Sequence, residues 1–363
     1  MMKNHRRMGI VLDWPLAYCL IGLLLFACLI LYSARSGDIV TIQRQMIRLL
    51  ISGAICLLAA QIHPRYYKAW APSIYTLGLF LLFCVLLFGE SSKGAQRWLD
   101  FRLFRFQPSE LMKLAVPLMV ATYLDEQLLP PKPKNILICL FLILLPGLLV
   151  IKQPDLGTGL LIISSGFFVL FLGGISWRLI FSAISLLILS LPAVWMFLRE
   201  YQRERVLTFL SPERDPLGSG YHIIQSKIAI GAGGVFGKGW MEGTQSQLNF
   251  LPERSTDFIF AVLSEEFGLI GVVVLFTLYA LLIARGLYIA YLAEGTFNQL
   301  ITGNIVLTFF LYVFVNVGMV SGLLPVVGVP LPLMSYGGTA LITLMIGWGI
   351  VMSIYTHRSS SRF

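Results

Sequence analysis

The sequence predicts an all-α integral membrane protein with ten transmembrane helices and one large extracytoplasmic loop between the seventh and eighth helices. Of the 363 residues, 57% are hydrophobic and only 12% are charged, and the mean hydropathy is +0.81. A soluble domain carries about 25% charged residues. The apolar runs are continuous and approach the roughly 20 residues that cross a bilayer, which favours helices over alternating barrel strands.

The ten predicted helices follow one another along a single polytopic membrane domain that takes in the whole chain, residues 1–363. They cover residues 14–33, 46–62, 70–88, 108–123, 136–151, 159–174, 179–198, 258–284, 299–321 and 337–355. The first run resembles the core of a signal peptide but exceeds the usual length of about 7–15 residues. We therefore predict that it is retained as the first helix.

The predicted orientation places both termini in the cytoplasm. An even number of spans puts both ends on one side, and Lys3, Arg6 and Arg7 precede the first span while Arg358 and Arg362 follow the last. The short loops on the two sides differ little in Lys and Arg content, so the outer face is unusually basic. Solvation of loops, attraction to anionic lipid head groups and binding of an anionic ligand would each explain this excess.

Residues 199–257 form the one sizeable predicted extramembrane segment. A loop this long is usually functional. Residues 221–230 read as a short interfacial helix, and Trp240 as an interface anchor. The glycines of this loop end in Gly237-Lys238-Gly239, which lacks the Ser or Thr of a phosphate-binding P-loop, so turn formation is the favoured interpretation over a phosphate cradle.

Charged residues inside the predicted spans are the next candidates for function. Glu110 and Lys113 are three residues apart and share a helical face, which predicts either a structural ion pair or a cavity wall that meets a polar substrate. Glu265 and Glu266 indicate a polar interior, a proton route or a structural network. Gln-Pro pairs at 107–108 and 153–154 each precede an acid and are typical of helix starts.

Asp257 is the last residue before the apolar run Phe-Ile-Phe of the eighth span, near the boundary between water and hydrocarbon. A carboxylate there is costly without compensation, which makes it a functional candidate. An acid in the first turn of a helix also interacts favourably with the helix dipole. The residues alone leave both interpretations open.

Several chemistries have no motif in this chain. The five cysteines all fall in predicted spans without metal-ligand spacing, and the four histidines are scattered. There is no zinc-hydrolase, serine-hydrolase or Asp-x-Asp motif. We therefore expect no metal site, no disulfide framework and no certain cofactor, although participation of a divalent cation stays open.

Seven motifs nevertheless resemble the SEDS family of peptidoglycan polymerases, in order along most of the chain. They are SKGAQRWL (92–99), FQPSE (106–110), QPDLGT (153–158), YHIIQS (221–226), LPERSTDF (251–258), LPVVGVPLP (324–332) and SYGG (335–338). The overall pattern is most similar to the rod-elongation branch of the family, rather than to its division and sporulation branches.

This resemblance implies an inverting glycosyltransferase that polymerises lipid II at the outer face of the inner membrane, for cell-wall elongation. The family's essential acid falls on Asp257, and its conserved cavity positions fall on Arg97, Trp98, Glu110 and Lys113. The implied partners are lipid II, the nascent glycan strand, a class B penicillin-binding protein, other membrane proteins of the elongation complex and membrane lipid, with no nucleic acid. A flippase for lipid-linked precursors and a non-catalytic scaffold remain the alternatives.

Overall fold

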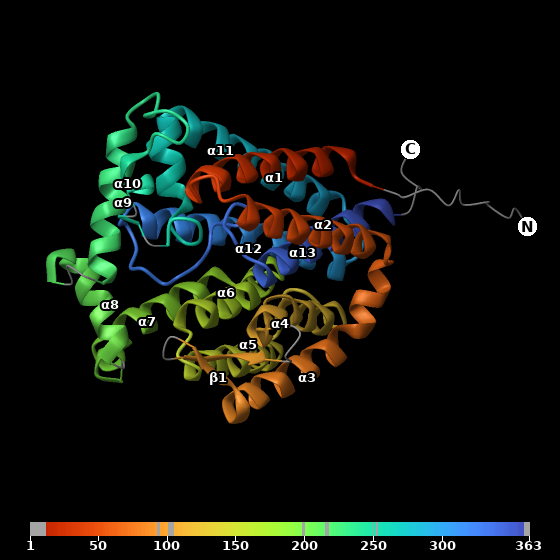
Figure 1. Ribbon diagram of the computed structural model, residues 1–363. Helices are drawn as coiled ribbons and strands as arrows, with labels where there is room; N and C mark the ends of the chain where they lie inside the picture. The colour runs from red at the N-terminus through yellow and green to blue at the C-terminus, as the bar shows by residue number, and fades with distance from the viewer. Residues whose placement is uncertain are drawn as a thin grey trace, which may run out of the picture.

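The computed structural model describes residues 12–92, 95–100, 105–197, 200–214, 218–248, 250–251 and 253–358. A helical bundle dominates this structure (Figure 1). One helix corresponds to each of the ten segments expected from the sequence. These helices are α1 (Trp14–Ala34), α2 (Ile39–Gln61), α3 (Pro64–Phe88), α4 (Pro108–Asp125), α5 (Pro133–Lys152), α6 (Leu156–Leu172), α7 (Trp177–Phe197), α11 (Ile259–Leu292), α12 (Thr296–Val320) and α13 (Thr339–Thr356).

The all-α expectation is wrong in one detail, because a small antiparallel sheet lies between α3 and α4. Its strands are β1 (Glu90–Ser92), β2 (Ala95–Asp100) and β3 (Arg105–Phe106), in the order β1-β2-β3. Strand β2 is paired on both sides, with Trp98 opposite Glu90 and Leu99 opposite Phe106. The strands are too short for a periodic signal, so no pattern in the sequence indicates them.

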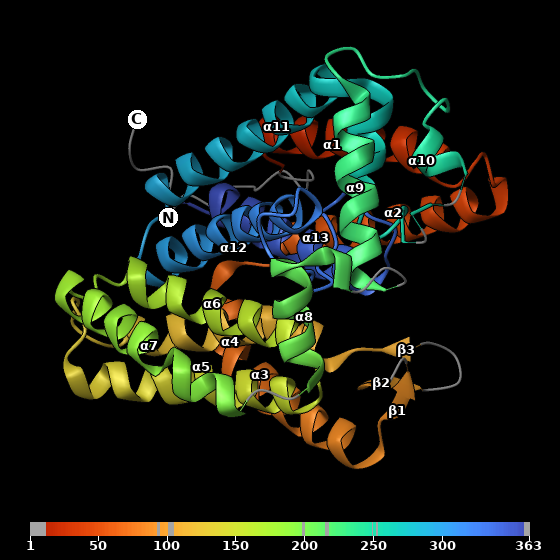
Figure 2. The ribbon, with the colours of Figure 1, turned by 90° about the vertical axis from the view of Figure 1, so that its left-hand side faces the viewer.

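The segment between α7 and α11 is also ordered into short elements. They are α8 (Glu200–Leu210), the 3₁₀ turn η1 (Pro212–Arg214), α9 (Ser219–Gly233) and α10 (Thr244–Gln247). Helix α9 contains the short helix expected at 221–230. Figure 2 shows α8 and α9 running across the ends of the bundle helices.

Seven of the ten long helices are long and apolar enough to cross a membrane: α1, α2, α3, α5, α11, α12 and α13. The other three differ for identifiable reasons. Helix α4 carries Glu110, Lys113 and Asp125, α6 has 17 residues, and the apolar part of α7 covers residues Trp177–Ala193. The chain is therefore a multi-pass membrane protein.

Two buried apolar clusters hold the bundle together, and α12 contributes to both. One cluster joins α1, α11 and α13, with Phe309 from α12 against Trp348. The other joins α3, α4, α5 and α6, with Leu300 and Ile301 from α12. Helix α12 lies between these two groups in Figure 1, so its polar side chains are placed at the centre of the molecule.

The start of α1 and the end of α13 lie at the same end of the bundle. Arg285 of α11 pairs with Asp13 at 2.5 Å, and its guanidinium lies 5.0 Å from the ring centroid of Tyr355. Helices α8, α9 and α10 lie at the opposite end (Figure 1).

Glycines allow the backbone of α11 to pack directly against the backbone of the segment between α9 and α10. Gly268 has a φ of +60° and interrupts the helix, and a Cβ there would lie 2.4 Å from the amide nitrogen of Gly237. The amides of Lys238 and Gly239 donate to the carbonyls of Glu265 and Glu266. These glycines therefore allow close packing of the two backbones. Because two amides of the Gly237-Lys238-Gly239 stretch bond to protein carbonyls, the stretch agrees with its interpretation as a turn.

Candidate active site

Asp257 lies in a tight turn that leads directly into α11. The amides of Thr256 and Phe258 both donate to the carbonyl of Glu253, at 3.2 and 3.3 Å. Phe258 is buried at the helix N-cap position, whereas the side chain of Asp257 is partly exposed. The turn therefore directs the carboxylate away from the apolar core in which the following residues are packed.

A second irregular segment, residues 321–338 between α12 and α13, holds this turn in place. The hydroxyl of Ser335 donates to the carbonyl of Thr256 at 2.5 Å, and the amide of Tyr336 donates to the carbonyl of Ser255 at 2.8 Å. Buried leucines anchor the segment itself, Leu331 and Leu333 among them. Two stretches of non-helical backbone thus satisfy each other's hydrogen bonds inside the bundle, as a membrane environment requires.

The side chain of Asn316, on α12, connects the same two segments. Its side chain is fully buried, and its amide group donates to the carbonyls of Asp257 at 2.9 Å and Val329 at 2.7 Å. The position of Asp257 is therefore fixed through its own carbonyl as well as through its neighbours.

The carboxylate of Asp257 faces Gly328 of the 321–338 segment. Gly328 has a φ of +74°, and a Cβ on it would lie 3.5 Å from Oδ2 of Asp257. The preceding residue, Val327, approaches the start of α6 so closely that a Cβ on Gly157 would lie 2.8 Å from its carbonyl oxygen. The segment therefore connects the Asp257 turn to the N-terminal end of α6.

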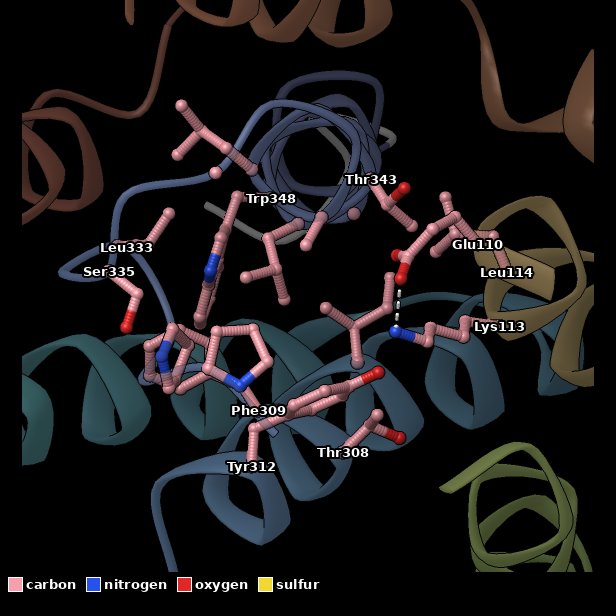
Figure 3. Close-up of a pocket in the computed structure, with 18 of the residues that line it drawn as sticks. Glu110, Lys113, Leu114, Thr308, Phe309, Tyr312, Leu333, Ser335, Thr343 and Trp348 are labelled. Carbon is pink, nitrogen blue, oxygen red and sulfur yellow. Dashed lines mark hydrogen bonds and ion pairs between the residues drawn. The ribbon is translucent and has the colours of Figure 1, made fainter. Parts of the chain in front are cut away.

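A cavity opens beside the 321–338 segment, between α4, α12 and α13. Most of its lining is apolar, with Phe309, Leu333 and Trp348 among the larger contributors. Figure 3 shows Glu110 and Lys113 on one side of this cavity, with Tyr312 and Thr308 nearby and Ser335 on the far side. Because Ser335 also bonds the Asp257 turn, the cavity and the turn share a wall.

Glu110 and Lys113 form the structural ion pair that the sequence allowed and also line the cavity, while contact with a polar substrate stays a prediction. Lys113 Nζ lies 2.6 Å from Glu110 Oε1, and both side chains are at most 9% exposed. Lys113 Nζ also lies 5.2 Å from the ring centroid of Tyr312. The two residues form a buried ion pair, and the same pair lines the cavity.

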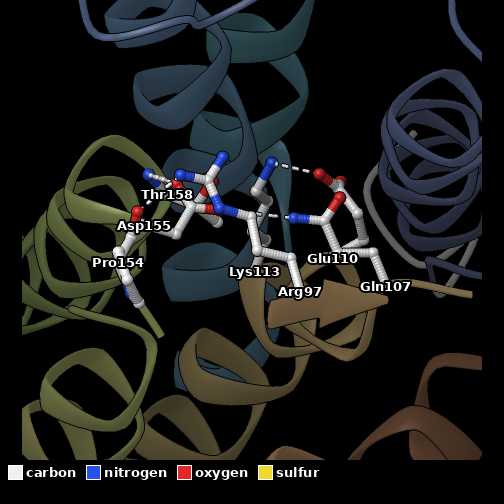
Figure 4. Close-up of polar contacts among 7 residues, drawn as sticks. All are labelled: Arg97, Gln107, Glu110, Lys113, Pro154, Asp155 and Thr158. Carbon is white, nitrogen blue, oxygen red and sulfur yellow. Dashed lines mark hydrogen bonds and ion pairs between the residues drawn. The ribbon is translucent and has the colours of Figure 1, made fainter. Parts of the chain in front are cut away.

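Arg97 takes part in a second polar cluster at the start of α6 (Figure 4). Its Nη2 donates to the carbonyl of Pro154 at 2.5 Å, and its Nε lies 3.6 Å from Oδ2 of Asp155. Gln107 reaches the same carboxylate oxygen at 3.4 Å, and Asp155 caps α6 through the amide of Thr158. The two Gln-Pro-acid motifs are thus brought together in space.

Trp98 follows Arg97 on β2 and is partly exposed. The two residues are adjacent in a strand, so their side chains point to opposite faces of the small sheet. Arg97 reaches the start of α6, and Trp98 is placed on the other face, away from that cluster.

The two adjacent acids of α11 serve a structural network. Glu265 is fully buried and accepts hydrogen bonds from Lys238 Nζ at 2.9 Å and the amide of Gln245 at 3.0 Å. Glu266 accepts a hydrogen bond from the hydroxyl of Ser33 at the end of α1. The pair therefore fastens residues 238–245 and α1 to α11, and does not line the cavity.

The polar residues around the cavity are balanced in charge and contain no metal cluster. Lys113 is matched by Glu110, and Arg97 is matched by Asp155. Among the residues that the structure describes, no group of three or more His, Cys, Asp or Glu side chains could hold a metal ion. The site therefore combines the partly exposed carboxylate of Asp257, several hydrogen-bonding side chains and an apolar cavity.

The fold and the site together define a polytopic membrane protein with a polar site at one end of its bundle and an apolar cavity beneath it. The FtsW/RodA/SpoVE family of cell cycle proteins matches residues 11–360, and the chain belongs to this family. The resemblance to SEDS proteins noted in the sequence is thereby confirmed.

Individual relatives agree with this assignment over nearly their whole length. The chain is 57% identical over 348 residues to peptidoglycan glycosyltransferase MrdB of Escherichia coli strain K12, covering 96% of this chain and 94% of MrdB. It is 36% identical to the probable peptidoglycan glycosyltransferase FtsW of Geobacter metallireducens, covering 93% and 92% of the two chains.

Solved structures extend the similarity to the fold. A chain from a peptidoglycan synthase complex that coordinates polymerisation and crosslinking has a TM-score of 0.83 and 34% identity, covering 96% of this chain and 98% of that one. The rod shape determining protein RodA of Thermus thermophilus has a TM-score of 0.74 and 27% identity, covering 97% and 100%.

Sequence reasoning missed the contacts that hold the site together. Asn316 lies near the end of an apolar helix and belongs to no charged pair or motif. Ser335 and Asp155 were noted only within the SYGG and QPDLGT motifs and, for Asp155, at a helix start, with no contact predicted for either. A polar amide inside a predicted span is a signal for a buried hydrogen bond, and it could have identified Asn316.

We expect Asn316→Leu to destabilise the protein strongly. The substitution leaves the carbonyls of Asp257 and Val329 buried without a donor, at about 1–3 kcal/mol each. Thermal unfolding in detergent measures the effect. The matched control is Asn298→Leu on the same helix, where a partly exposed asparagine bonds the carbonyl of Glu294. Equal melting temperatures for the two variants would contradict the role assigned to Asn316.

Proposed function

We propose that this chain is a peptidoglycan glycosyltransferase that polymerises lipid II into β-1,4-linked glycan strands, with release of polyprenyl diphosphate, for cell-wall elongation and rod shape. The observation that carries the proposal is the Asp257 turn: a partly exposed carboxylate, fixed through backbone hydrogen bonds beside an apolar cavity. The activity of MrdB as a peptidoglycan glycosyltransferase, at 57% identity over 96% of the chain, supports the same function.

The proposed topology has ten transmembrane helices in the inner membrane, both termini in the cytoplasm and residues 199–257 on the outer side. Lys3, Arg6 and Arg7 at the N-terminus favour this orientation. Because Asp257 lies at the same end of the bundle as α9 and α10, the reaction then takes place at the outer membrane surface.

In the proposed mechanism Asp257 is the general base. Its carboxylate accepts the proton of the acceptor 4-hydroxyl while that oxygen attacks the anomeric carbon of the donor sugar. The bond from that carbon to the diphosphate oxygen breaks as the new glycosidic bond forms, which inverts an α-linked donor to a β-linked product. Acid–base assistance of this kind contributes about 10²–10⁴-fold to the rate.

The remaining site residues are proposed to bind the substrate. Lys113 and Arg97 supply positive charge near the leaving diphosphate. Each already has a carboxylate partner, Glu110 or Asp155, so substrate binding there involves sharing or exchange of that partner. Glu110 and Trp98 would contact the sugars. A divalent cation could share the role at the diphosphate.

Partners follow from the family. Lipid II, the nascent glycan strand and membrane lipid contact the chain during the reaction. A class B penicillin-binding protein, together with other elongation-complex membrane proteins, is the proposed protein partner. A related chain of 34% identity comes from a complex that coordinates polymerisation with crosslinking, which supports a crosslinking partner for this chain.

A flippase is the second candidate function, and a non-catalytic scaffold is the third. Buried charges such as Glu110 and Lys113 also occur in transport pathways. The structure favours neither, because Glu265 and Glu266 fasten a loop and do not continue a polar route through the bundle.

We expect Asp257→Asn to abolish polymerisation of lipid II by the purified protein. The amide is nearly the same size but cannot accept the proton, so the rate should fall by at least about 100-fold. Electrophoresis of the glycan products measures the rate, and an unchanged melting temperature shows that the variant is folded. Glu126→Gln, at an exposed position beyond α4, is the control. A folded Asp257→Asn protein with wild-type activity would refute the assignment.

The charged pair of α4 is tested with a double variant. Glu110→Leu or Lys113→Met alone leaves an uncompensated buried charge and should cost about 3–5 kcal/mol of stability. The double variant Glu110→Leu/Lys113→Met removes both charges, so we expect it to fold yet to polymerise lipid II at least roughly tenfold more slowly, as expected for loss of a charged substrate contact.

The control for the double variant is Lys68→Met, which breaks the ion pair with Asp125 at the other end of α4. This substitution should leave the polymerisation rate unchanged. Wild-type activity in the double variant would show that Glu110 and Lys113 only stabilise the bundle.

A further inference from the structure

Two arginines lie over the ring of Tyr336, and a third lies on the Asp257 turn that is bonded to the same tyrosine. The guanidinium carbons of Arg35 and Arg48 lie 5.1 and 4.5 Å from the ring centroid of Tyr336. Arg254 belongs to the Asp257 turn, and its Nη2 donates to Ser36 Oγ at 3.1 Å. We refer to Arg35, Arg48 and Arg254 as the arginine cluster.

The members of the cluster are close enough to influence each other. Burial, and next the positive charge of Arg35, lower the pKa of Arg254, and the carboxylate of Glu266 offsets this lowering only in part. The amide of Tyr336 is bonded to Ser255, so the ring that carries Arg35 and Arg48 is fixed one residue from Arg254. Like charges held together in this way destabilise the protein unless an anion compensates them.

No protein carboxylate lies within ion-pair distance of these three arginines in the described part of the chain. The cations found there in ion pairs are Lys68, Arg97, Lys113, Lys238 and Arg285. Asp38 and Glu266 act on Arg35 and Arg254 only at longer range, and each has a local donor: Asp38 accepts from Thr41 and the amide of Val40, and Glu266 accepts from Ser33.

The cluster also retains unused hydrogen-bond donors. Nε of Arg35 and Nη1 of Arg254 are buried without a hydrogen-bond partner among the described residues. Stacking on an aromatic ring uses the face of a guanidinium and leaves its N–H edge available, and that edge matches the geometry of a phosphate group.

The surroundings are those of a lipid. An apolar groove lies between the outer ends of α1 and α2, and it is lined by Tyr32, Ile39, Ile42, Gln43, Met46 and Ile47. Trp240 stacks on Tyr32 with ring centroids 5.7 Å apart, and such aromatic side chains are enriched at the level of lipid head groups. Arg35 follows Tyr32 by one helical turn, and Arg48 follows Ile47 directly.

We propose that the arginine cluster is a binding site for the phosphate of a lipid head group. The arginine N–H edges hold the phosphate oxygens, and a hydrocarbon chain of the same lipid occupies the groove between α1 and α2. The site is separate from the charge-balanced pairs formed by Arg97 and Lys113. It does not depend on the proposed reaction, because its evidence is the gathering of three arginines without an ion-pair partner and the unpartnered N–H groups of Arg35 and Arg254.

The test is a binding measurement on the full-length protein in a zwitterionic detergent. Phosphatidylglycerol and phosphatidylcholine are titrated separately and followed by native mass spectrometry, and sodium diphosphate is titrated by calorimetry. The variant is Arg35→Gln/Arg48→Gln. Its matched control, Arg178→Gln/Arg358→Gln, removes two arginines at the start of α7 and beyond the end of α13.

We expect the wild type to prefer phosphatidylglycerol, and the cluster variant to lose about tenfold in affinity for each arginine removed, hence roughly 100-fold in total. The control should keep wild-type affinity. Loss of diphosphate binding without loss of the lipid preference would identify a soluble diphosphate as the source of the phosphate and overturn the lipid assignment. Equal affinities in the cluster variant and the wild type, for every ligand, would overturn the site itself.

Should the double variant elute abnormally, the single variant Arg48→Gln is measured in its place. The expected loss is then about tenfold, with Arg178→Gln as the control. Because binding is measured without lipid II, failure of this proposal is distinguishable from failure of the proposed polymerase activity.

Discussion

One buried amide group, that of Asn316, holds the candidate site together. It donates to the carbonyls of Asp257 and Val329, which belong to the two stretches of non-helical backbone inside the bundle. In hydrocarbon an unsatisfied carbonyl costs several kcal/mol. A partly exposed carboxylate can therefore occupy a fixed place at the end of α11 only because α12 and the 321–338 segment satisfy the backbone around it.

The distribution of charge follows from the same constraint. Within the bundle, Lys113 is matched by Glu110 and Arg97 by Asp155, since an unpaired charge would be costly there. Where α1 ends and α2 begins, an anion from outside the protein can supply the missing partner. A group of arginines without an ion-pair partner, such as the arginine cluster, marks a place where such an anion is expected.

Much of the architecture could be predicted from the sequence because it depends on apolar runs. The ten expected helical segments and the short helix at 221–230 each correspond to a helix, with ends shifted by several residues. The small sheet was not predicted, since its strands of two to six residues have no measurable periodicity. Membrane crossing is supported by length and composition for seven helices, while the charges of α4 and the shortness of α6 weaken the same signal there.

The site was predictable only in part. The spacing of Glu110 and Lys113 predicted their pairing, because residues three apart meet on one helical face. The contacts of Asp257 with Asn316 and Gly328 join residues more than fifty positions apart, and no local pattern encodes them. For the same reason, the division of the outer basic residues into paired arginines and a separate cluster emerged only from the fold.

The central claim is that this chain itself joins the sugars. The most direct measurement supplies lipid II to the purified protein in detergent micelles, where no membrane separates two compartments. The account predicts glycan polymers and released polyprenyl diphosphate under these conditions. Intact lipid II in detergent, with movement of lipid II across the bilayer when the same preparation is placed in sealed vesicles, would contradict it and identify a transporter.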